Sequence, residues 1–283
     1  HNWTNKLSFE NKDKMETKQL TSIPETMLIP LWAKATEYNH PRPILSDPFA
    51  AEMIGQVDYD FTKFKGAKMS QVGVCVRAKL IDDETKEFLA QHPDAVVIQL
   101  GAGIDARYQR LGKPNVGHWY DLDLPEVIAI RRQLLPETEK NTYLSLSLFD
   151  EEWIKTVKKH NAPVLIILEG VLMYFDEEQV KTFFNMVCSQ LNNTTILLEI
   201  LAYMLVKHAK QHDAVSKTEH KAEFRWSILN TADMEQWHPH LHLSKEYYMS
   251  DYDQGRYPFL FRMLYKVPFF YRRGNQRVAK FCI

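Results

Sequence analysis

The sequence predicts an α/β fold in which helices wind on both sides of a mainly parallel sheet. Short apolar, β-branched runs recur along the chain, at 95–100, 116–121, 164–168 and 194–201. Helical patterns separate them, at 124–135 and 177–191. Strands that alternate with helices favour parallel pairing through right-handed crossovers. The run Ala95–Leu100 is largely apolar, which is typical of a strand buried on both faces.

Composition excludes several classes of protein. The 283 residues are 45% hydrophobic and 25% charged, which is ordinary for a globular domain and excludes a largely disordered chain. Lys and Arg total 35 and Asp and Glu total 36, so no basic excess attracts nucleic acid. No apolar run approaches the ~18 residues that cross a bilayer. We therefore expect neither nucleic acid nor membrane as a partner.

The cysteines and the start of the chain favour a cytoplasmic location. The three cysteines are odd in number and far apart, which predicts neither a disulfide framework nor a zinc knuckle. A reducing compartment is the default for such a chain. The first residues are polar and charged, and they show no apolar core of a signal peptide.

The rest of the chain is expected to surround the parallel core within one domain over 1–283. Helices are predicted before the core at 23–34, 48–54 and 72–91, a helix start at 105–111, and late strands at 241–249 and 276–283. The predicted divisions are a solvated arm over 1–20, a helical cover over 21–92, the ligand-binding core over 93–202, a helical lid or insertion over 203–250 and C-terminal strands over 251–283.

Two glycines mark a candidate ligand site directly after the first core strand. Ligands of open α/β sheets bind beyond the carboxyl ends of the strands, where Gly101 and Gly103 fall. Glycine allows a tight turn and a close approach of the backbone to a ligand. Asp121 and Asp123 end the next strand, where a carboxylate can accept both hydroxyls of a ribose. The glycines also fit the looser dinucleotide pattern or a turn without ligand, and Asp121 could cap the helix that opens near Pro125.

Four segments in order narrow these alternatives. They are Val74–Lys79, Gly101–Arg107, Asp121–Pro125 and Leu168–Tyr174. With them the sequence resembles the leucine carboxyl methyltransferase family, which includes bacterial polyketide O-methyltransferases, from about Thr21 to Tyr203. The resemblance implies a class I, Rossmann-like fold with a seven-stranded sheet, N-terminal helices and a helical lid. It also implies S-adenosylmethionine as cofactor and S-adenosylhomocysteine as its product.

The resemblance implies a role for individual residues. Arg77 matches the arginine that pairs with the methionyl carboxylate, and Gly101 matches the glycine whose backbone passes along the cofactor. Asp123 matches the acid that holds the ribose, ahead of Asp121. Glu169 matches an acid near the cofactor's amino group and sulfonium, and Tyr174, the catalytic candidate, matches a tyrosine that faces the methyl group. The remaining residues expected at the cofactor are Ala102, Gly103, Asp105, Leu124, Ser147, Leu148 and Gly170, and Lys34 matches a basic residue of the N-terminal segment across a gap.

The adenine contact departs from the family pattern. Members of the family often carry Asp-Leu where this chain has Ser147 and Leu148. Ser147 could accept the bond from the adenine amino group, or Asp150 could take that role. Leu148 can still pack on the ring.

No metal is predicted. His238, His240 and His242 alternate, and a strand would place all three imidazoles on one face. However, no acid or cysteine is fixed near them by spacing, and Pro239 disturbs a strand.

A general base does not stand out in the sequence. An acceptor hydroxyl would need one, whereas a carboxylate is already ionised at pH 7. His208, His212 and His220 are candidates by location alone. We expect Tyr174 to shape the acceptor site instead, because a tyrosine pKa near ~10 is too high for a base.

Three functions compete at this point. The first is an S-adenosylmethionine-dependent O-methyltransferase that acts on a carboxylate or hydroxyl of a small, polyketide-like metabolite. The second is a nicotinamide-dependent oxidoreductase, in which Arg77 and Glu169 would have no task. The third is a non-catalytic module that binds a nucleoside. The sequence makes no prediction of the oligomeric state.

Overall fold

A seven-stranded sheet forms the centre of the computed structural model, which describes residues 25–206, 208, 214–217 and 223–283. Its strands are β1 (Val96–Leu100), β2 (His118–Asp123), β3 (Asn141–Ser145), β4 (Val164–Leu168), β5 (Thr194–Ile200), β6 (His242–Tyr248) and β7 (Arg277–Cys282). Their order across the sheet is β3-β2-β1-β4-β5-β7-β6. The first five are parallel, and β7 runs antiparallel to both of its neighbours. The predicted doubly wound, mainly parallel sheet is confirmed.

The register of the strands brings their carboxyl ends to one level. Leu100 of β1 pairs with Leu122 of β2 on one side and with Leu168 of β4 on the other. Leu168 in turn pairs with Leu198 of β5. The residues that follow these four leucines therefore lie in a row along the edge of the sheet. The strand order reverses between β1 and β4, which is where an open α/β sheet binds its ligand.

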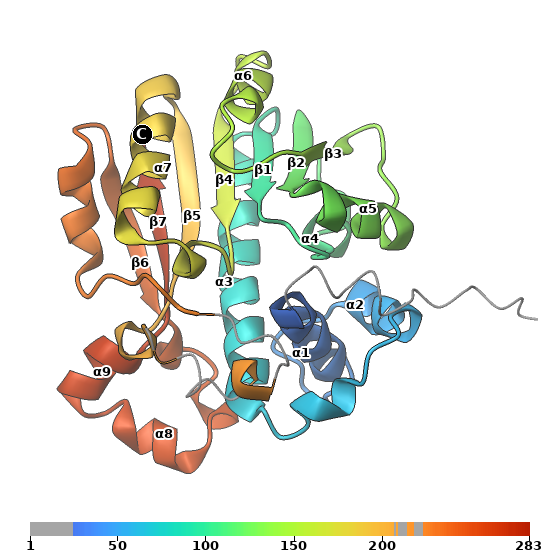
Figure 1. The fold of residues 1–283 in the computed structure, drawn as a ribbon, viewed down its shortest axis with the longest axis vertical. Coiled ribbons are helices and arrows are strands. Elements are labelled where there is room, and N and C mark those ends of the chain that lie inside the picture. Colours follow the sequence, from blue (N-terminus) through green and yellow to red (C-terminus); the bar gives the residue numbers. More distant parts are fainter. Residues whose placement is uncertain (1–24, 207, 209–213, 218–222) are drawn as a thin grey trace, which may run out of the picture.

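Helices cover both faces of the sheet and its carboxyl edge (Figure 1). They are α1 (Leu28–Tyr38), α2 (Pro48–Met53), α3 (Lys68–Gln91), α4 (Arg107–Arg110), α5 (Pro125–Leu134), α6 (Glu152–Lys158), α7 (Glu177–Gln190), α8 (Phe259–Leu264) and α9 (Pro268–Gly274). Alternate strand residues face opposite sides. Ile98 and Ile166 pack in one core with α6 and α7, whereas Val97 and Leu165 pack in another with α3. In Figure 1, α1 and α2 lie beyond the carboxyl ends of the parallel strands.

The edge strand β3 was not anticipated from the residue pattern. Its sequence, Asn141–Ser145, lacks an apolar run, and its burial alternates. It pairs with β2 alone, so it is not enclosed between neighbours as β1 and β4 are. Residues 105–111, predicted as a helix start, form only the single turn α4.

The late part of the chain corrects two predictions. The described residues of 203–250, predicted as a helical lid, contain 3-10 helices and strand β6 but no α-helix. The region 251–283, predicted as strands, contains α8 and α9 before β7. Part of the first region packs on the sheet, where Trp226 is buried and Trp237 packs against the core on the α7 face. The predicted arm over 1–20 lies outside the described residues.

Candidate active site

A cavity of about 400 Å³ opens at the carboxyl edge of the sheet, between the strand ends and α1. All but one of the site residues predicted from sequence line it: Arg77, Gly101, Ala102, Gly103, Asp105, Asp123, Leu124, Ser147, Leu148, Glu169, Gly170 and Tyr174. These residues come together because those that follow the paired leucines lie side by side at the edge of the sheet. Gly101, Asp123 and Glu169 each follow the last paired leucine of their strand.

Asp121 does not reach the cavity. It is 1% exposed and lies one pleat before the strand end. Its Oδ2 accepts hydrogen bonds from Arg131 Nη2 and Asn141 Nδ2, both at 2.8 Å, and its Oδ1 accepts one from Trp119 Nε1 at 3.2 Å. The structure therefore does not bring Asp121 to the cavity with the other predicted site residues. The side chain instead ties β2 to β3 and α5.

Asp123 faces the cavity and hydrogen-bonds the loop after β1, which contains Gly101 and Gly103. Its Oδ2 accepts a hydrogen bond from the Gly103 amide and its Oδ1 accepts one from the Leu124 amide, both at 2.8 Å. Burial raises the pKa of Asp123, although these two amides oppose the shift. Each carboxylate oxygen has a second lone pair, so Asp123 can still accept from a ligand hydroxyl.

Gly101 is required where the loops after β1 and β4 meet. Its φ is +67°, and a Cβ there would stand 2.4 Å from Val171 Cγ2. A side chain would therefore force the two loops apart. Arg131 holds the same loop from the other side, because its Nη1 donates to the carbonyls of Gly103 at 3.1 Å and Asp105 at 2.8 Å. Arg131 was not predicted at the site from the sequence.

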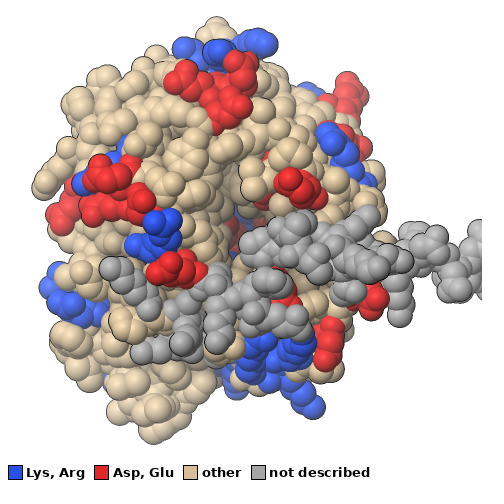
Figure 2. All heavy atoms as spheres, in the orientation of Figure 1, with Lys and Arg blue, Asp and Glu red and all other residues tan. Residues whose placement is uncertain are grey.

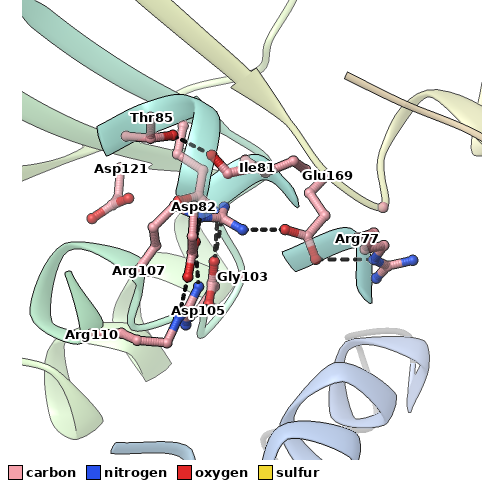
Figure 3. Close-up of polar contacts among 12 residues, drawn as sticks. Arg77, Ile81, Asp82, Thr85, Gly103, Asp105, Arg107, Arg110, Asp121 and Glu169 are labelled. Carbon is pink, nitrogen blue, oxygen red and sulfur yellow. Dashed lines mark hydrogen bonds and ion pairs between the residues drawn. The ribbon is translucent and has the colours of Figure 1, made fainter. Parts of the chain in front are cut away.

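Arg77 stands between the carboxylates of Glu169 and Glu199 at the edge of the sheet, and Figure 3 shows its contact with Glu169. Its Nε contacts Glu169 Oε1 at 3.0 Å, and its Nη1 contacts Glu199 Oε1 at 2.7 Å. The other oxygen of Glu199 accepts from the Gly170 amide at 2.8 Å. The Nη2 of Arg77 makes no hydrogen bond with any described residue, and Arg77 lines the cavity. One donor pair of the guanidinium is thus available to a ligand.

Glu199 is a further residue of this site, and it was not predicted from the sequence. It lies one residue before the end of the apolar strand β5, and Leu198 before it is in register with Leu168, the residue before Glu169. That shared pattern was the signal that could have found it.

A second set of ion pairs extends from Glu169 to the start of α4. Arg107 donates through Nη2 to Glu169 Oε2 and through Nε to Asp82 Oδ1 at 2.7 Å. Asp105 receives Lys34 Nζ at 2.7 Å and Arg110 Nη1 at 2.9 Å. The whole cluster holds the cations Lys34, Arg77, Arg107 and Arg110 and the carboxylates Asp47, Asp82, Asp105, Glu169 and Glu199. With all groups ionised, the carboxylates exceed the cations by one.

The charges of this cluster shift its carboxyl groups in different directions. Burial raises the pKa of Glu169, but Arg107, Lys34 and Arg77 outweigh it and bring the pKa to about 2. Lys34, Arg110 and Arg107 likewise hold the pKa of Asp105 well below its usual value against burial. The pKa of Glu199 is raised, because its burial and the charge of Glu169 outweigh its bond to Arg77. Glu169 and Asp105 are therefore both firmly ionised beside the cavity.

Apolar side chains line the other part of the cavity around Tyr174. The Tyr174 ring lies 5.9 Å from the ring of Phe224, and its hydroxyl is hydrogen-bonded to Thr26. Burial raises the pKa of Tyr174. The apolar lining further includes Met27, Ile29, Leu31, Met173, Phe175, Leu201 and Val215. One cavity thus joins a charged wall to an apolar one.

The two candidates for an adenine contact lie in different places. Ser147 lines the cavity, and its Oγ accepts from the Phe149 amide at 3.2 Å. Asp150 is not in the lining, and its Oδ1 accepts from the Glu152 amide at 2.9 Å. Leu148 is buried against the lining next to Ser147.

None of the described histidines considered as bases or metal ligands lines this cavity. His208 is exposed and hydrogen-bonds the Val206 carbonyl at 2.7 Å, whereas His212 and His220 lie outside the described residues. The rings of His238 and His240 are 5.1 Å apart. In the described part of the chain, no three His, Cys, Asp or Glu side chains are placed to hold a metal ion.

Comparisons with known proteins give the chain its relatives. The model of the family described as leucine carboxyl methyltransferase matches residues 27–188, which include every lining residue before β5 except Thr26. The tetracenomycin polyketide synthesis O-methyltransferase TcmP of Streptomyces glaucescens is 33% identical over 83% of this chain and 86% of its own length. The S-adenosyl-L-methionine-dependent methyltransferase dpfgK of Gibberella zeae is 25% identical over 91% of this chain and 93% of its own.

A solved structure supports the fold alone. A DUF574 family protein from Streptomyces avermitilis superposes with a TM-score of 0.56 over 93% of this chain and 99% of its own, at 12% identity.

Replacement of Gly101 by alanine tests the contact between the two loops. Gly112→Ala is the control, because Gly112 also has a positive φ, +79°, but a Cβ added there would have nothing within 4 Å. Gly112→Ala should lower the free energy of unfolding by about 1 kcal/mol through backbone strain alone. Gly101→Ala should lower the free energy of unfolding further, and adding Val171→Ala to it should restore part of the stability that Gly101→Ala loses beyond Gly112→Ala. Urea unfolding of the wild type, the two single variants and the double variant is the measurement. Equal losses for the two single variants would refute the contact.

Replacement of Glu169 by glutamine tests the buried cluster. It removes the carboxylate that Arg77 and Arg107 share. Because Arg77 keeps Glu199 and Arg107 keeps Asp82, the loss should be about 3 kcal/mol of unfolding free energy at pH 7, the low end for a broken buried ion pair. Asp83→Asn, which breaks the exposed pair with Lys79, should cost about 1 kcal/mol or less. Because the pKa of Glu169 is lowered on folding, its contribution is complete above its unfolded pKa and is lost as the pH falls toward about 2. The gap between wild type and Glu169→Gln should therefore narrow in acid, and a gap that is constant from pH 7 to pH 3 would contradict this assignment.

Proposed function

The chain belongs to the leucine carboxyl methyltransferase family and is an S-adenosylmethionine-dependent methyltransferase, and on this premise we propose that it methylates an oxygen of a small, apolar, ring-bearing metabolite. The observation that carries the proposal is the single cavity in which ionised residues at the sheet edge meet an apolar wall around Tyr174. The charged part suits the cofactor, and the apolar part suits the acceptor.

The charged residues fit S-adenosylmethionine group by group. Arg77 has an Nη2 with no described partner, which can receive the methionyl carboxylate. Glu169 stays ionised beside it, so it can balance the ammonium and the sulfonium. The excess of one carboxylate in the cluster favours a ligand of net positive charge, as this cofactor is.

The loops supply the nucleoside end. Asp123 keeps lone pairs for the ribose hydroxyls while it fixes the Gly103 amide. Gly101 lets the loop after β1 pack against Val171 while its backbone lines the cavity. We place Ser147 and Leu148 at the adenine and leave Asp150 out, because Asp150 does not line the cavity.

Methyl transfer requires the protein mainly to position the reactants and to exclude water from them. The bound cofactor supplies an electrophilic methyl group, which the acceptor oxygen takes as the carbon–sulfur bond breaks. The contribution of this chain is to hold the acceptor in line and to exclude water. Met27, Met173 and Phe224 provide the apolar wall that does so.

The lining favours an acceptor oxygen that is already ionised near neutral pH, such as a carboxylate or an acidic phenol. None of the described lining residues is a histidine. Tyr174 has a raised pKa and stays protonated, and Glu169 is held by two arginines. The relative named for tetracenomycin polyketide synthesis makes a polyketide-like acid a reasonable first class of acceptor to test.

Ligand-dependent unfolding tests the cofactor assignment. S-adenosylmethionine or S-adenosylhomocysteine at ~100 times its dissociation constant should add ~2.7 kcal/mol of stability and raise the thermal midpoint, whereas NAD should not. Asp123→Asn should reduce the rise, because it weakens the acceptor for the ribose. Asp150→Asn is the control and should leave the rise unchanged. A rise with NAD alone would overturn the cofactor assignment in favour of an oxidoreductase.

The role of Tyr174 is tested by Tyr174→Phe, with the exposed Tyr38→Phe as control. We expect Tyr174→Phe to lower kcat by less than about tenfold, because a buried tyrosine with a raised pKa packs against the acceptor and takes no proton. Methyl transfer from labelled cofactor to a panel of aromatic hydroxy acids is the measurement. A loss of about 100-fold or more would mean that Tyr174 acts as the general base.

A further inference from the structure

The helices α8 and α9, with the turn between them, are apolar on both sides. We call residues 257–274 the α8–α9 hairpin. On its inner side, Phe261, Tyr265 and Phe270 line a second cavity of about 320 Å³. On its outer side, five large apolar residues are exposed: Phe259 (72%), Leu260 (65%), Met263 (43%), Val267 (50%) and Phe269 (64%). A helix that is apolar all round is normally buried, in a protein core or against lipid.

The hairpin also carries an unbalanced positive charge. Its charged residues are all cations: Arg262, Lys266, Arg272 and Arg273. The sequence has no Asp or Glu after Asp253. Among the described residues, none of the four cations forms an ion pair, in contrast to the buried arginines of the first cavity. The described surface over α8 and α9, at the lower left of Figure 2, is accordingly drawn tan and blue.

The neighbouring turn adds to the same surface. Tyr203 and Met204 are 41% and 40% exposed. The guanidinium of Arg273 stands over the Tyr203 ring at 5.6 Å and over the Phe269 ring at 4.9 Å. The cation is therefore held among exposed rings, which is the arrangement of residues that settle at the boundary between water and hydrocarbon.

We propose that the α8–α9 hairpin docks on an anionic lipid surface. Apolar side chains would enter the boundary between headgroups and acyl chains, and the cations would meet the acidic headgroups. The charge selects this partner over a second copy of the chain. Two identical hairpins facing each other would bring four cations against four, and the hairpin itself carries no carboxylate. One carboxylate outside it, Asp251, accepts from the Tyr271 hydroxyl, which leaves the cations in excess.

The proposal revises the expectation that no membrane is involved. That expectation depended on the overall charge of −1 and on the lack of a spanning segment. None of the described helices is long and apolar enough to span a bilayer. Neither fact bears on a local, peripheral contact, and the proposal does not depend on methyl transfer.

Sedimentation with lipid vesicles tests the proposal. The full chain should bind vesicles of phosphatidylcholine and phosphatidylserine, bind vesicles of phosphatidylcholine much less, and lose binding as salt is added. Arg262→Gln with Lys266→Gln should weaken the binding about thirtyfold, at about 1 kcal/mol for each cation. Phe259→Ser with Phe269→Ser should weaken it by about tenfold or more.

The control is Lys158→Gln with Lys159→Gln, which removes the same charge around the end of α6, at the other end of the molecule (Figure 1). It should leave binding unchanged, and the thermal midpoints of all variants verify that they fold. Equal binding to both vesicle types, or an equal loss in the control and the hairpin variants, would overturn the proposal. So would a dimer in solution that Phe259→Ser dissociates, because the hairpin would then be an interface between copies.

Discussion

The pairing of Glu169 with Arg77 and Arg107 is the constraint on which the rest of the site depends. An ionised carboxylate that is almost fully buried is stable only where its charge is compensated. Arg77 comes from α3 and Arg107 from α4, so the compensation fixes both helices against the end of β4. The loop between β1 and α4 must then follow a path short enough to deliver Arg107. That path is the one that Gly101 and Gly103 permit, since both have a positive φ.

The same constraint explains why the first cavity has a charged wall at all. Desolvated charges are expensive, and a network that served folding alone could be replaced by apolar side chains at little cost. Here the network is incomplete in one place, because Arg77 keeps one nitrogen without a described partner and lines the cavity. The carboxylates also outnumber the cations by one. Both features suit a ligand that carries a carboxylate and a larger positive charge.

Much of this arrangement follows from the sequence, because it depends on local pattern. The apolar runs that became β1 and β4 end at Leu100 and Leu168. Gly101 was predicted at the site because it follows such a run, and Glu169 because it matches an acid of the family pattern. The residues that were missed have partners far away in the chain. Arg131 is recognisable as a clamp only when the carbonyl of Gly103 is beside it. Asp121 shows the opposite case. Its spacing from the glycines along the sequence fits a ligand contact, but its carboxylate accepts hydrogen bonds from Arg131 and Asn141 instead.

The outer face of the α8–α9 hairpin shows the limit of interpreting aromatic residues as core. The sequence alone makes Phe261 and Phe269 alike, since both lie in the same aromatic and basic stretch. The structure separates them, because Phe261 lines the second cavity and Phe269 is 64% exposed. Partial burial of Phe261 stabilises the fold, whereas exposure of Phe269 costs solvation free energy that the folded chain alone does not recover. A surface that exposes apolar side chains among unpaired cations suits a neighbour that is both apolar and anionic.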